Sequence, residues 1–215
     1  MRVLVLSDVH AEEGALEDTR SRLSAERYDA VVLLGDITNR GPVSFAEDFL
    51  EMLGESEVKV FALFGNMDVR EVRLLLEEAG VGIHAKKVEL GEGWSLAGFG
   101  GSGPTPFGTP TEFSEEEIYN GLKGLKIDAK TILATHAPPY DVGLDNVRSG
   151  PAGSRSIRRI IEERQPAINL CGHIHEHEGE AKIGETRIVK VGAAMMGRAA
   201  ELEVGKKIEA KLISL

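Results

Sequence analysis

Cysteine is almost absent from this chain, because Cys171 is the only one among 215 residues. A single cysteine excludes an intramolecular disulfide framework and is typical of a reducing compartment. The sequence also lacks an apolar run of membrane-spanning length and an N-terminal signal peptide. We therefore expect a soluble, cytoplasmic protein without membrane association.

Basic side chains are scarce relative to acidic ones. The chain has 25 Lys and Arg against 35 Asp and Glu, which gives a net charge of −10 at pH 7. Such a surface repels polyanions as a whole, so we expect no stable non-specific binding of nucleic acid. A local metal site or arginine cluster could still attract a phosphate group.

The length and composition suit one globular domain over residues 1–215. Apolar residues make up 42% of the chain and charged residues 28%, which is ordinary for a soluble protein with a sizeable core. No internal repeat or low-complexity segment interrupts it.

The first third of the sequence alternates short apolar runs with helical patterns. We expect buried strands at 3–6, 30–34 and 58–64, and helices at 11–27, 44–53 and 69–79, with Ser44 capping the second helix. This β-α-β-α-β-α order predicts an α/β fold with parallel strands.

The remainder has more loops. Residues 82–90 and 94–99 predict a hairpin, and the Gly/Pro-rich stretch 98–110 predicts a loop at the rim of a site. Ser114 begins a helix, and Ser154 caps another that ends near Arg164. Strands are expected at 130–135 and 167–170, with a loop over 140–153. The tail, 180–215, predicts two hairpins.

Polar side chains follow five of these strands at the point where each one ends. In an open α/β sheet, ligands bind in the crevice outside the carboxyl ends of the strands. Oxygen and nitrogen groups gathered there suit divalent metals, and seven of them exceed the needs of one tetrahedral ion. We therefore predict two cations, with the lone carboxylate of Asp36 shared between them. The seven candidate ligands are Asp8, His10, Asp36, Asn66, His136, His173 and His175.

The order of these motifs resembles the calcineurin-like metallophosphoesterases. The resemblance runs from residue 3 to about residue 193 and rests on Asp8-x-His10, Gly35-Asp36, Gly65-Asn66-x-Asp68, His136 and Gly172-His173-x-His175. It implies a four-layer α-β-β-α sandwich of two mixed sheets. It also implies Asp8, His10 and His175 on a first ion, Asn66, His136 and His173 on a second, and Asp36 bridging.

Two positions depart from the family pattern. Many members have a His after the Gly-Asn pair that protonates the leaving oxygen, whereas this chain has Met67, which cannot donate a proton. In the protein-phosphatase branch an acid orients that His, and Asn39 stands at the acid's position. We infer that another donor is used, either water or His84, or that the leaving groups need little protonation. Arg40 matches a residue that grips phosphate in that branch.

The resemblance implies a metal-dependent phosphoric ester hydrolase acting on a small phosphate ester, with nucleotide derivatives among the candidates. A pair of ions lowers the pKa of a bridging water and clamps the phosphoryl oxygens during in-line attack. We expect a phosphodiesterase, since the chain lacks an obvious cap and the His acid. The metals could be Mn, Fe, Ni, Zn or Co, with manganese as first choice. The candidate catalytic residues are Asp36, Asn66, His136 and Arg40.

Other functions remain open from the sequence. The fold could serve as a non-catalytic binding module, as in the retromer subunit that resembles it, although such modules tend to lose metal-binding His residues. A phosphomonoesterase and a mononuclear zinc hydrolase are further alternatives; the latter leaves Asp36 or Asn66 without a role. Asp68 either caps the helix from Val69 or supports the ligands from behind. His84 is expected to be structural, and His177 to face solvent.

Overall fold

Two β-sheets pack face to face at the centre of the protein. This computed structural model describes residues 1–215. A buried apolar cluster lies between the sheets and takes side chains from both, including Val3, Val32, Ile132 and Leu170. Because both faces of each sheet are covered, the central strands are apolar throughout rather than alternating.

The first sheet has five strands in the order β13-β12-β1-β2-β3. Strands β1, β2 and β3 are parallel, as the sequence predicts, while β12 runs antiparallel to both β1 and β13. The strands are β1 Arg2–Leu6, β2 Ala30–Leu33, β3 Lys59–Ala62, β12 Arg198–Val204 and β13 Ile208–Ser214.

The second sheet has six strands in the order β10-β11-β9-β6-β5-β4. Its four central strands are parallel, and the edge strands β10 and β4 are antiparallel to their neighbours. The strands are β4 Lys86–Gly91, β5 Trp94–Phe99, β6 Thr131–Thr135, β9 Ile168–Cys171, β10 Gly179–Ile183 and β11 Thr186–Lys190.

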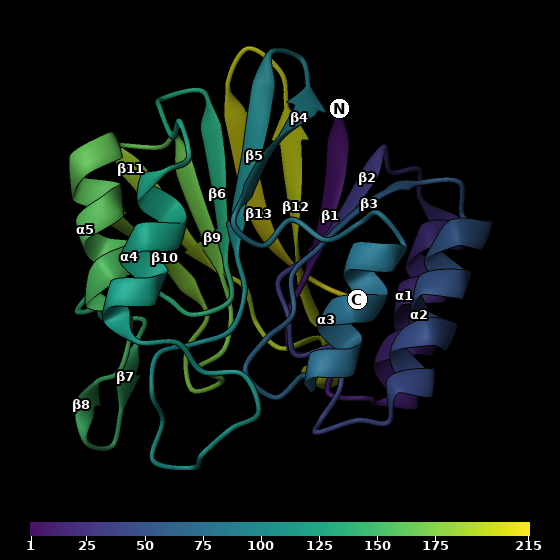
Figure 1. The fold of residues 1–215 in the computed structure, drawn as a ribbon. Helices are drawn as coiled ribbons and strands as arrows, with labels where there is room; N and C mark the ends of the chain where they lie inside the picture. Colours follow the sequence, from purple (N-terminus) through teal and green to yellow (C-terminus); the bar gives the residue numbers. More distant parts are fainter.

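Helices cover the outer face of each sheet (Figure 1). Three pack on the first sheet, namely α1 Glu13–Ala25, α2 Val43–Glu55 and α3 Arg70–Glu78. Two pack on the second, α4 Glu115–Lys123 and α5 Arg155–Arg164. The protein is therefore the four-layer α-β-β-α sandwich that the family resemblance implies.

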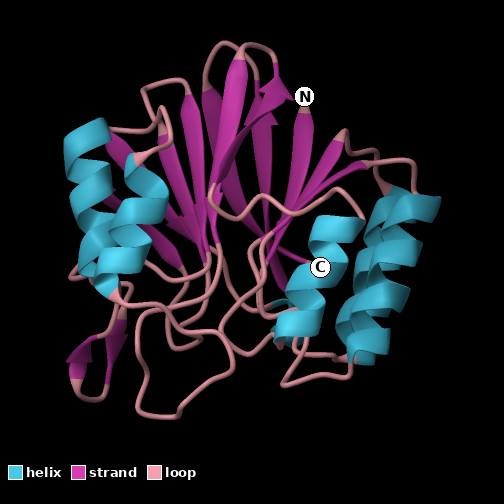
Figure 2. Cartoon of the chain, in the orientation of Figure 1, coloured by secondary structure: helices cyan, strands magenta, loops and turns pink.

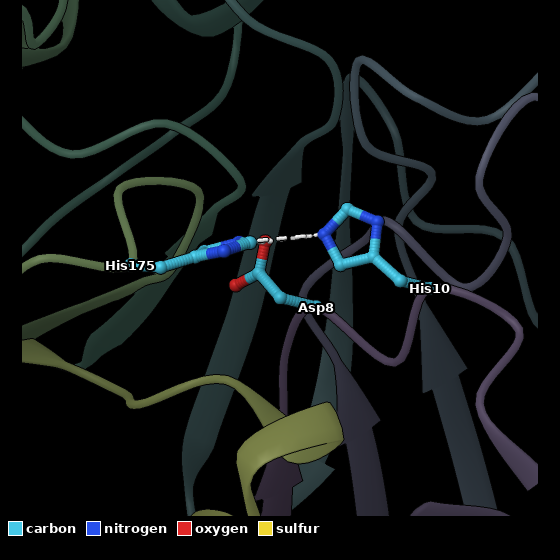
Figure 3. Close-up of side chains that lie close together, drawn as sticks. All are labelled: Asp8, His10 and His175. Carbon is cyan, nitrogen blue, oxygen red and sulfur yellow. Dashed lines mark hydrogen bonds and ion pairs between the residues drawn. The ribbon is translucent and has the colours of Figure 1, made fainter.

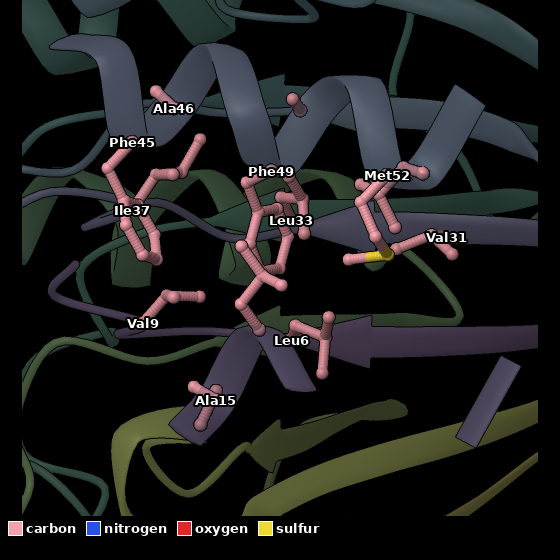
Figure 4. Packing of buried hydrophobic residues seen from close by; sticks show 14 of the residues in the cluster. Leu6, Val9, Ala15, Val31, Leu33, Ile37, Phe45, Ala46, Phe49 and Met52 are labelled. Carbon is pink, nitrogen blue, oxygen red and sulfur yellow. The ribbon is translucent and has the colours of Figure 1, made fainter. Parts of the chain in front are cut away.

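The packing of α2 shows how one outer layer forms. Phe45, Phe49 and Met52 recur on one face of the helix and contact apolar side chains of the sheet such as Leu6 and Leu33 (Figure 4). This spacing of three or four residues turns a single apolar stripe toward the core. Burying each such side chain contributes roughly 1.5–3 kcal/mol to stability.

The helix starts predicted from the sequence are confirmed for two helices and wrong for a third. Ser114 caps α4 in a capping box with Glu117, and the Ser154 hydroxyl accepts a hydrogen bond from the backbone N–H of Ile157 to cap α5. The prediction that Ser44 caps α2 is wrong, because the helix begins at Val43 after Pro42. Pro42 is the N-cap residue and is extended, with φ −72° and ψ 149°, so Ser44 lies inside the first turn.

Two further segments differ from expectation. The stretch 140–153 contains a short hairpin of β7, Asn146–Val147, and β8, Gly150–Pro151. Strand β4 begins at Lys86 rather than at residue 82, because residues 82–84 make only isolated bridges. The two C-terminal hairpins are confirmed, one in each sheet.

Candidate metal centre

All seven candidate ligands follow the carboxyl ends of parallel strands. Loops from both sheets gather at this one end of the sandwich, toward the lower edge of Figure 2. Asp8 and His10 follow β1, Asp36 follows β2 and Asn66 follows β3 in the first sheet; His136 follows β6, and His173 and His175 follow β9 in the second.

The first group of ligand atoms comes from both sheets. Asp8, His10 and His175 bring their ligand atoms within 4.8 Å of one another. The Nε2 atom of His175 lies 3.2 Å from Asp8 Oδ1 and 3.3 Å from His10 Nε2. Figure 3 shows the two imidazoles and the carboxylate pointing toward one another.

The second group lies deeper in the protein. Asp36, His136 and His173 likewise bring ligand atoms within 4.8 Å of one another. The Nε2 atom of His136 lies 2.9 Å from Asn66 Oδ1, so the Asn66 amide oxygen joins this group. The composition of both groups matches the assignment that the family resemblance implies.

Asp36 lies between the two groups. Its Oδ2 atom is 3.4 Å from His136 Nε2 in the second group and 3.7 Å from His10 Nε2 in the first. Its Oδ1 atom accepts a hydrogen bond of 2.7 Å from the backbone N–H of Met67, which fixes the carboxylate. One carboxylate oxygen therefore faces ligand nitrogens of both groups, as a bridging ligand requires.

The protonation of His136 tests whether these residues fit a metal. Its Nδ1 atom lies 3.0 Å from the carbonyl oxygen of Leu34 and donates to it, because a carbonyl can only accept. In the neutral tautomer, Nε2 then presents a lone pair to the oxygens of Asp36 and Asn66, which are acceptors as well. A divalent cation satisfies all three atoms together, so the residues fit it.

The electrostatics of the bare ligand set lead to the same conclusion. Burial alone lowers the pKa of His136, but the Asp36 carboxylate more than compensates and raises it to about 9. The direction of this shift reflects the buried carboxylates around His136, whose charge a bound cation would balance. In the first group, Asp8 Oδ1 is buried without a hydrogen-bond partner. Such a buried acceptor is costly unless an ion or proton satisfies it.

The other three candidate imidazoles differ in the direction of their pKa shifts. Burial, followed by repulsion from His136, lowers the pKa of His173 to about 4, and burial lowers that of His10. Interaction with the Asp8 carboxylate, whose Oδ1 atom lies 3.2 Å from His175 Nε2, raises the pKa of His175. His173 and His10 are therefore neutral at pH 7, which is the state that binds a metal.

Backbone geometry concentrates strain at these positions. Asp8, His10, Asp36 and His173 have φ values of 57°, 53°, 52° and 73°, in the left-handed region that non-glycine residues seldom adopt. The neighbouring glycines are required sterically. A Cβ atom at Gly65 would collide with the Asp36 side chain, and one at Gly172 would collide with Ser7 and Asp8.

Asp68 supports the centre from behind and does not cap a helix. Helix α3 begins at Arg70, with Val69 at its N-cap position. The buried Asp68 carboxylate accepts hydrogen bonds from the backbone N–H groups of Gly65 at 2.8 Å and Thr38 at 2.7 Å. It therefore ties the loop that carries Asp36 to the loop that carries Asn66. Of the two roles that the sequence left open, the structure supports the second.

Lys190 is a supporting residue that the sequence analysis did not identify. Its side chain is 1% exposed, and its ammonium donates to the carbonyl oxygens of Ile174 and His177. These carbonyls belong to the loop that presents His173 and His175. The signal in the sequence was a lysine within the otherwise apolar end of strand β11, where a solvated side chain has no room.

The groups that replace the usual proton donor face the same cleft. Met67, Asn39 and Arg40 line a hollow of about 410 Å³ together with five of the candidate ligands, His10, Asp36, Asn66, His173 and His175. Arg40 also donates to the carbonyl oxygen of Gly108 at 3.2 Å, which joins this cleft to the Gly/Pro-rich loop. Met67 and Asn39, at the positions where the family resemblance implies a proton-donating His and its orienting acid, therefore place a thioether and an amide at this cleft.

His84 does not reach this cleft. Its ring packs among Phe64, Phe99 and Phe113, and its Nδ1 atom accepts a hydrogen bond of 3.1 Å from Gly100 N–H. Burial, with a further contribution from Arg73, lowers its pKa to about 4. His84 is therefore wrong as the alternative proton donor and is structural. His177 is exposed, as expected.

Comparison with known proteins identifies the class. Residues 1–177 match the calcineurin-like phosphoesterase family, so the chain belongs to it. Membership supports a hydrolase that acts on phosphate esters with divalent metals. No helix has the length and apolar character needed to cross a membrane.

The chain is similar to other proteins over most of their length. An uncharacterized protein of Methanocaldococcus jannaschii is 38% identical over 197 residues, which are 88% of this chain and 87% of that protein. A dimetal phosphatase from Danio rerio superimposes with a TM-score of 0.71 at 13% identity, covering 100% of this chain and 98% of that one. An archaeal phosphodiesterase gives a TM-score of 0.56 at 14% identity and covers 100% of both chains.

Proposed function

We propose that the protein is a metal-dependent phosphodiesterase. In this proposal Asp8, His10 and His175 hold one ion, and Asn66, His136 and His173 hold a second. The Asp36 carboxylate is shared by both ions. When bound, two such ions supply an activated water and neutralise the charge on the phosphoryl oxygens. The position of the Asp36 Oδ2 atom, within 4 Å of ligand nitrogens from each group, is the observation that carries this proposal.

The chain's own residues would position the ester and the ligands. Asn66 lines the cleft, and His136 lies buried behind it with Nε2 2.9 Å from Asn66 Oδ1, so that both would hold the second ion beside the phosphate. Arg40 lines the same cleft and can donate two parallel hydrogen bonds to phosphate oxygens. The backbone N–H of Met67 keeps Asp36 in its bridging orientation.

The preference for diesters rests on what lines the cleft beside these ligands. Met67 and Asn39 offer no proton to a leaving oxygen, so an ester with an acidic leaving group is the suitable substrate. The archaeal phosphodiesterase of the same fold supports this reaction class. Histidine nitrogen and carboxylate oxygen ligands suit Mn, Fe, Ni, Zn and Co. Of these metals we propose manganese first.

The test is hydrolysis of bis(p-nitrophenyl) phosphate by the purified protein with Mn²⁺, Ni²⁺, Zn²⁺ or Co²⁺. We expect turnover that Asp36→Asn abolishes, and faster turnover of the diester than of p-nitrophenyl phosphate. Absence of turnover with every metal would favour a non-catalytic binding module. Faster hydrolysis of the monoester would favour a phosphomonoesterase instead.

We also propose a cytoplasmic location. The buried Cys171 can form no disulfide within the chain and is compatible with a reducing compartment. Fractionation of the source cells followed by immunodetection tests this.

A further inference from the structure

A cavity of about 620 Å³ adjoins the metal cleft. His173 and Phe107 line both hollows, so a ligand whose phosphate lies among the metal ligands can extend into this cavity. The volume falls within the range of roughly 300–1,000 Å³ that small-molecule sites occupy. The cavity therefore has the position and size of a site for the organic part of an ester.

Two segments far apart in the sequence form most of its wall. One is the Gly/Pro-rich stretch 102–107 after β5, and the other is the hairpin β7–β8 with the residues up to Ser154. Both lie at the loop end of the sandwich, below the sheets in Figure 1. Neither carries a metal-binding motif, so this wall is a feature of this chain rather than of the metal centre.

Apolar side chains form one part of the wall. Phe107 is the most prominent side chain, because it is a large aromatic group that is 78% exposed. A ring this exposed at the cavity rim offers a large apolar face against which a ligand group can pack. The apolar side chains of the lining are Pro104, Pro106, Phe107, Ala137, Val147, Ala152 and Ile174.

The charges of the lining disfavour a second phosphate. Arg148, in the turn of the hairpin, is the only Lys or Arg in the wall, whereas Glu115 and Glu176 are both carboxylates. The Glu115 carboxylate already accepts hydrogen bonds from the Ser154 hydroxyl at 3.0 Å and from Ser156 N–H at 2.6 Å. The wall thus carries net negative charge, which disfavours an anionic group in the cavity.

We propose that this cavity binds the organic group of the phosphate ester, and that this group is uncharged and flat, as in an aryl or nucleoside ester. The inference rests on the proposed function, because the phosphate is assumed to lie at the metal ligands. Phe107 is the specificity-determining residue, offering one face of its ring to the ligand. Its backbone is held by the contact of Arg40 with Gly108 next to it.

The test uses phosphonates, which bind at a phosphate site but are not hydrolysed. Dissociation constants of methylphosphonate, phenylphosphonate, 3-phosphonopropionate and a thymidine 5′-phosphonate are measured by calorimetry on the Mn²⁺-loaded protein. Burial of the ring should make phenylphosphonate bind at least about tenfold tighter than methylphosphonate. The anionic tail of 3-phosphonopropionate should bring no gain. The thymidine compound distinguishes a nucleoside from a simple aryl group.

Two variants link the preference to the cavity. Phe107→Ala should remove most of the advantage of the phenyl group, and Ala152→Phe should remove it by filling the space. Ala152→Phe, which lines the cavity but not the metal cleft, should leave methylphosphonate binding unchanged. Leu74→Ala is the matched control, because Leu74 is also an exposed apolar residue but lies on α3, away from the cavity.

The outcomes separate this inference from the proposed function. Equal binding of phenyl- and methylphosphonate, or a phenyl preference unaffected by both variants, would overturn the cavity proposal even in an active enzyme. A phenyl preference lost in both variants would support it even if no diester is hydrolysed. Tighter binding of 3-phosphonopropionate than of phenylphosphonate would also overturn it.

Discussion

The Nε2 atoms of His10 and His175 lie 3.3 Å apart, although the two residues are 165 positions apart in the chain. His10 follows the first strand of one sheet and His175 follows a strand of the other. At most one of these nitrogens can donate to the other when both rings are neutral, and Asp8 Oδ1 lies 3.2 Å from His175. Packing of the two sheets therefore creates a ligand set that neither sheet has alone.

His175→Ala should abolish the hydrolysis of bis(p-nitrophenyl) phosphate. Loss of a direct ligand should lower the affinity for one ion by more than the roughly 10–100-fold loss that follows mutation of residues supporting a ligand. His177→Ala is the control, because His177 is two residues away but exposed. Steady-state kinetics across Mn²⁺ concentrations measure the effect, and equal losses in both variants would contradict the assignment.

Lys190→Met should weaken metal binding by roughly 10–100-fold without removing a ligand. The ammonium of Lys190 donates to the carbonyl oxygens of Ile174 and His177, and methionine cannot replace these bonds. Turnover at saturating Mn²⁺ should recover to near the wild-type value, which a general loss of structure would not allow. Lys182→Met, an exposed lysine on the adjacent strand β10, should change neither quantity.

Met67→His together with Asn39→Asp should extend activity to esters with poor leaving groups. Both positions line the cleft, and the pair would restore a proton donor with an orienting acid. General acid catalysis contributes about 10²–10⁴-fold, so alkyl esters should gain much more than p-nitrophenyl esters. The measurement is the ratio of kcat/KM for the two leaving groups. Met196→His, at an exposed position outside the cleft, should leave that ratio unchanged.

Stability should fall in acid through Glu201, far from the metal centre. This carboxylate accepts hydrogen bonds from Arg2 and Arg22, each at 2.7 Å, and from Tyr28. Burial alone raises the pKa of Glu201, but these donors outweigh it and lower the pKa from 4.5 to about 2. Because the folded value is depressed, the stabilisation is present above pH 4.5 and is lost as the pH falls toward 2.

Glu201→Gln should therefore cost about 1–3 kcal/mol of unfolding free energy at pH 7 and much less near pH 3. Denaturant unfolding at both pH values measures this difference. Glu203→Gln, an exposed position on the same strand, is the control. A cost for Glu201→Gln that does not vary with pH would show that the lost contacts are not those of an ionised carboxylate.

The sequence predicted the parts that depend on local pattern and strand order. Apolar runs followed by Asp8, Asp36 and His136 predicted both the strands and the edge at which ligands meet, because parallel strands end on the same side. The family resemblance supplied the four layers and the grouping of the ligands. Asp68 could be assigned only from the structure, since an Asp before a helix is also a common cap.

Other features depend on contacts that no local pattern encodes. The β12–β13 hairpin completes the first sheet beside β1, although it comes last in the chain. The role of Lys190 depends on a loop 13–16 residues away in sequence that folds over its ammonium. The cavity at Phe107 forms between the stretch 102–107 and the β7–β8 hairpin, which are separate in the sequence. The start of α2 after Pro42, rather than at a cap by Ser44, was also not predicted.

Metal content tests the central claim most directly. The protein is loaded with Mn²⁺, dialysed against metal-free buffer and analysed by mass spectrometry for metal per chain, alongside His175→Ala and the control His177→Ala. We predict about two ions per chain for the wild type and for the control, and about one for His175→Ala. One ion or fewer per wild-type chain at saturating metal, or no loss in His175→Ala, would contradict a binuclear centre built by both sheets.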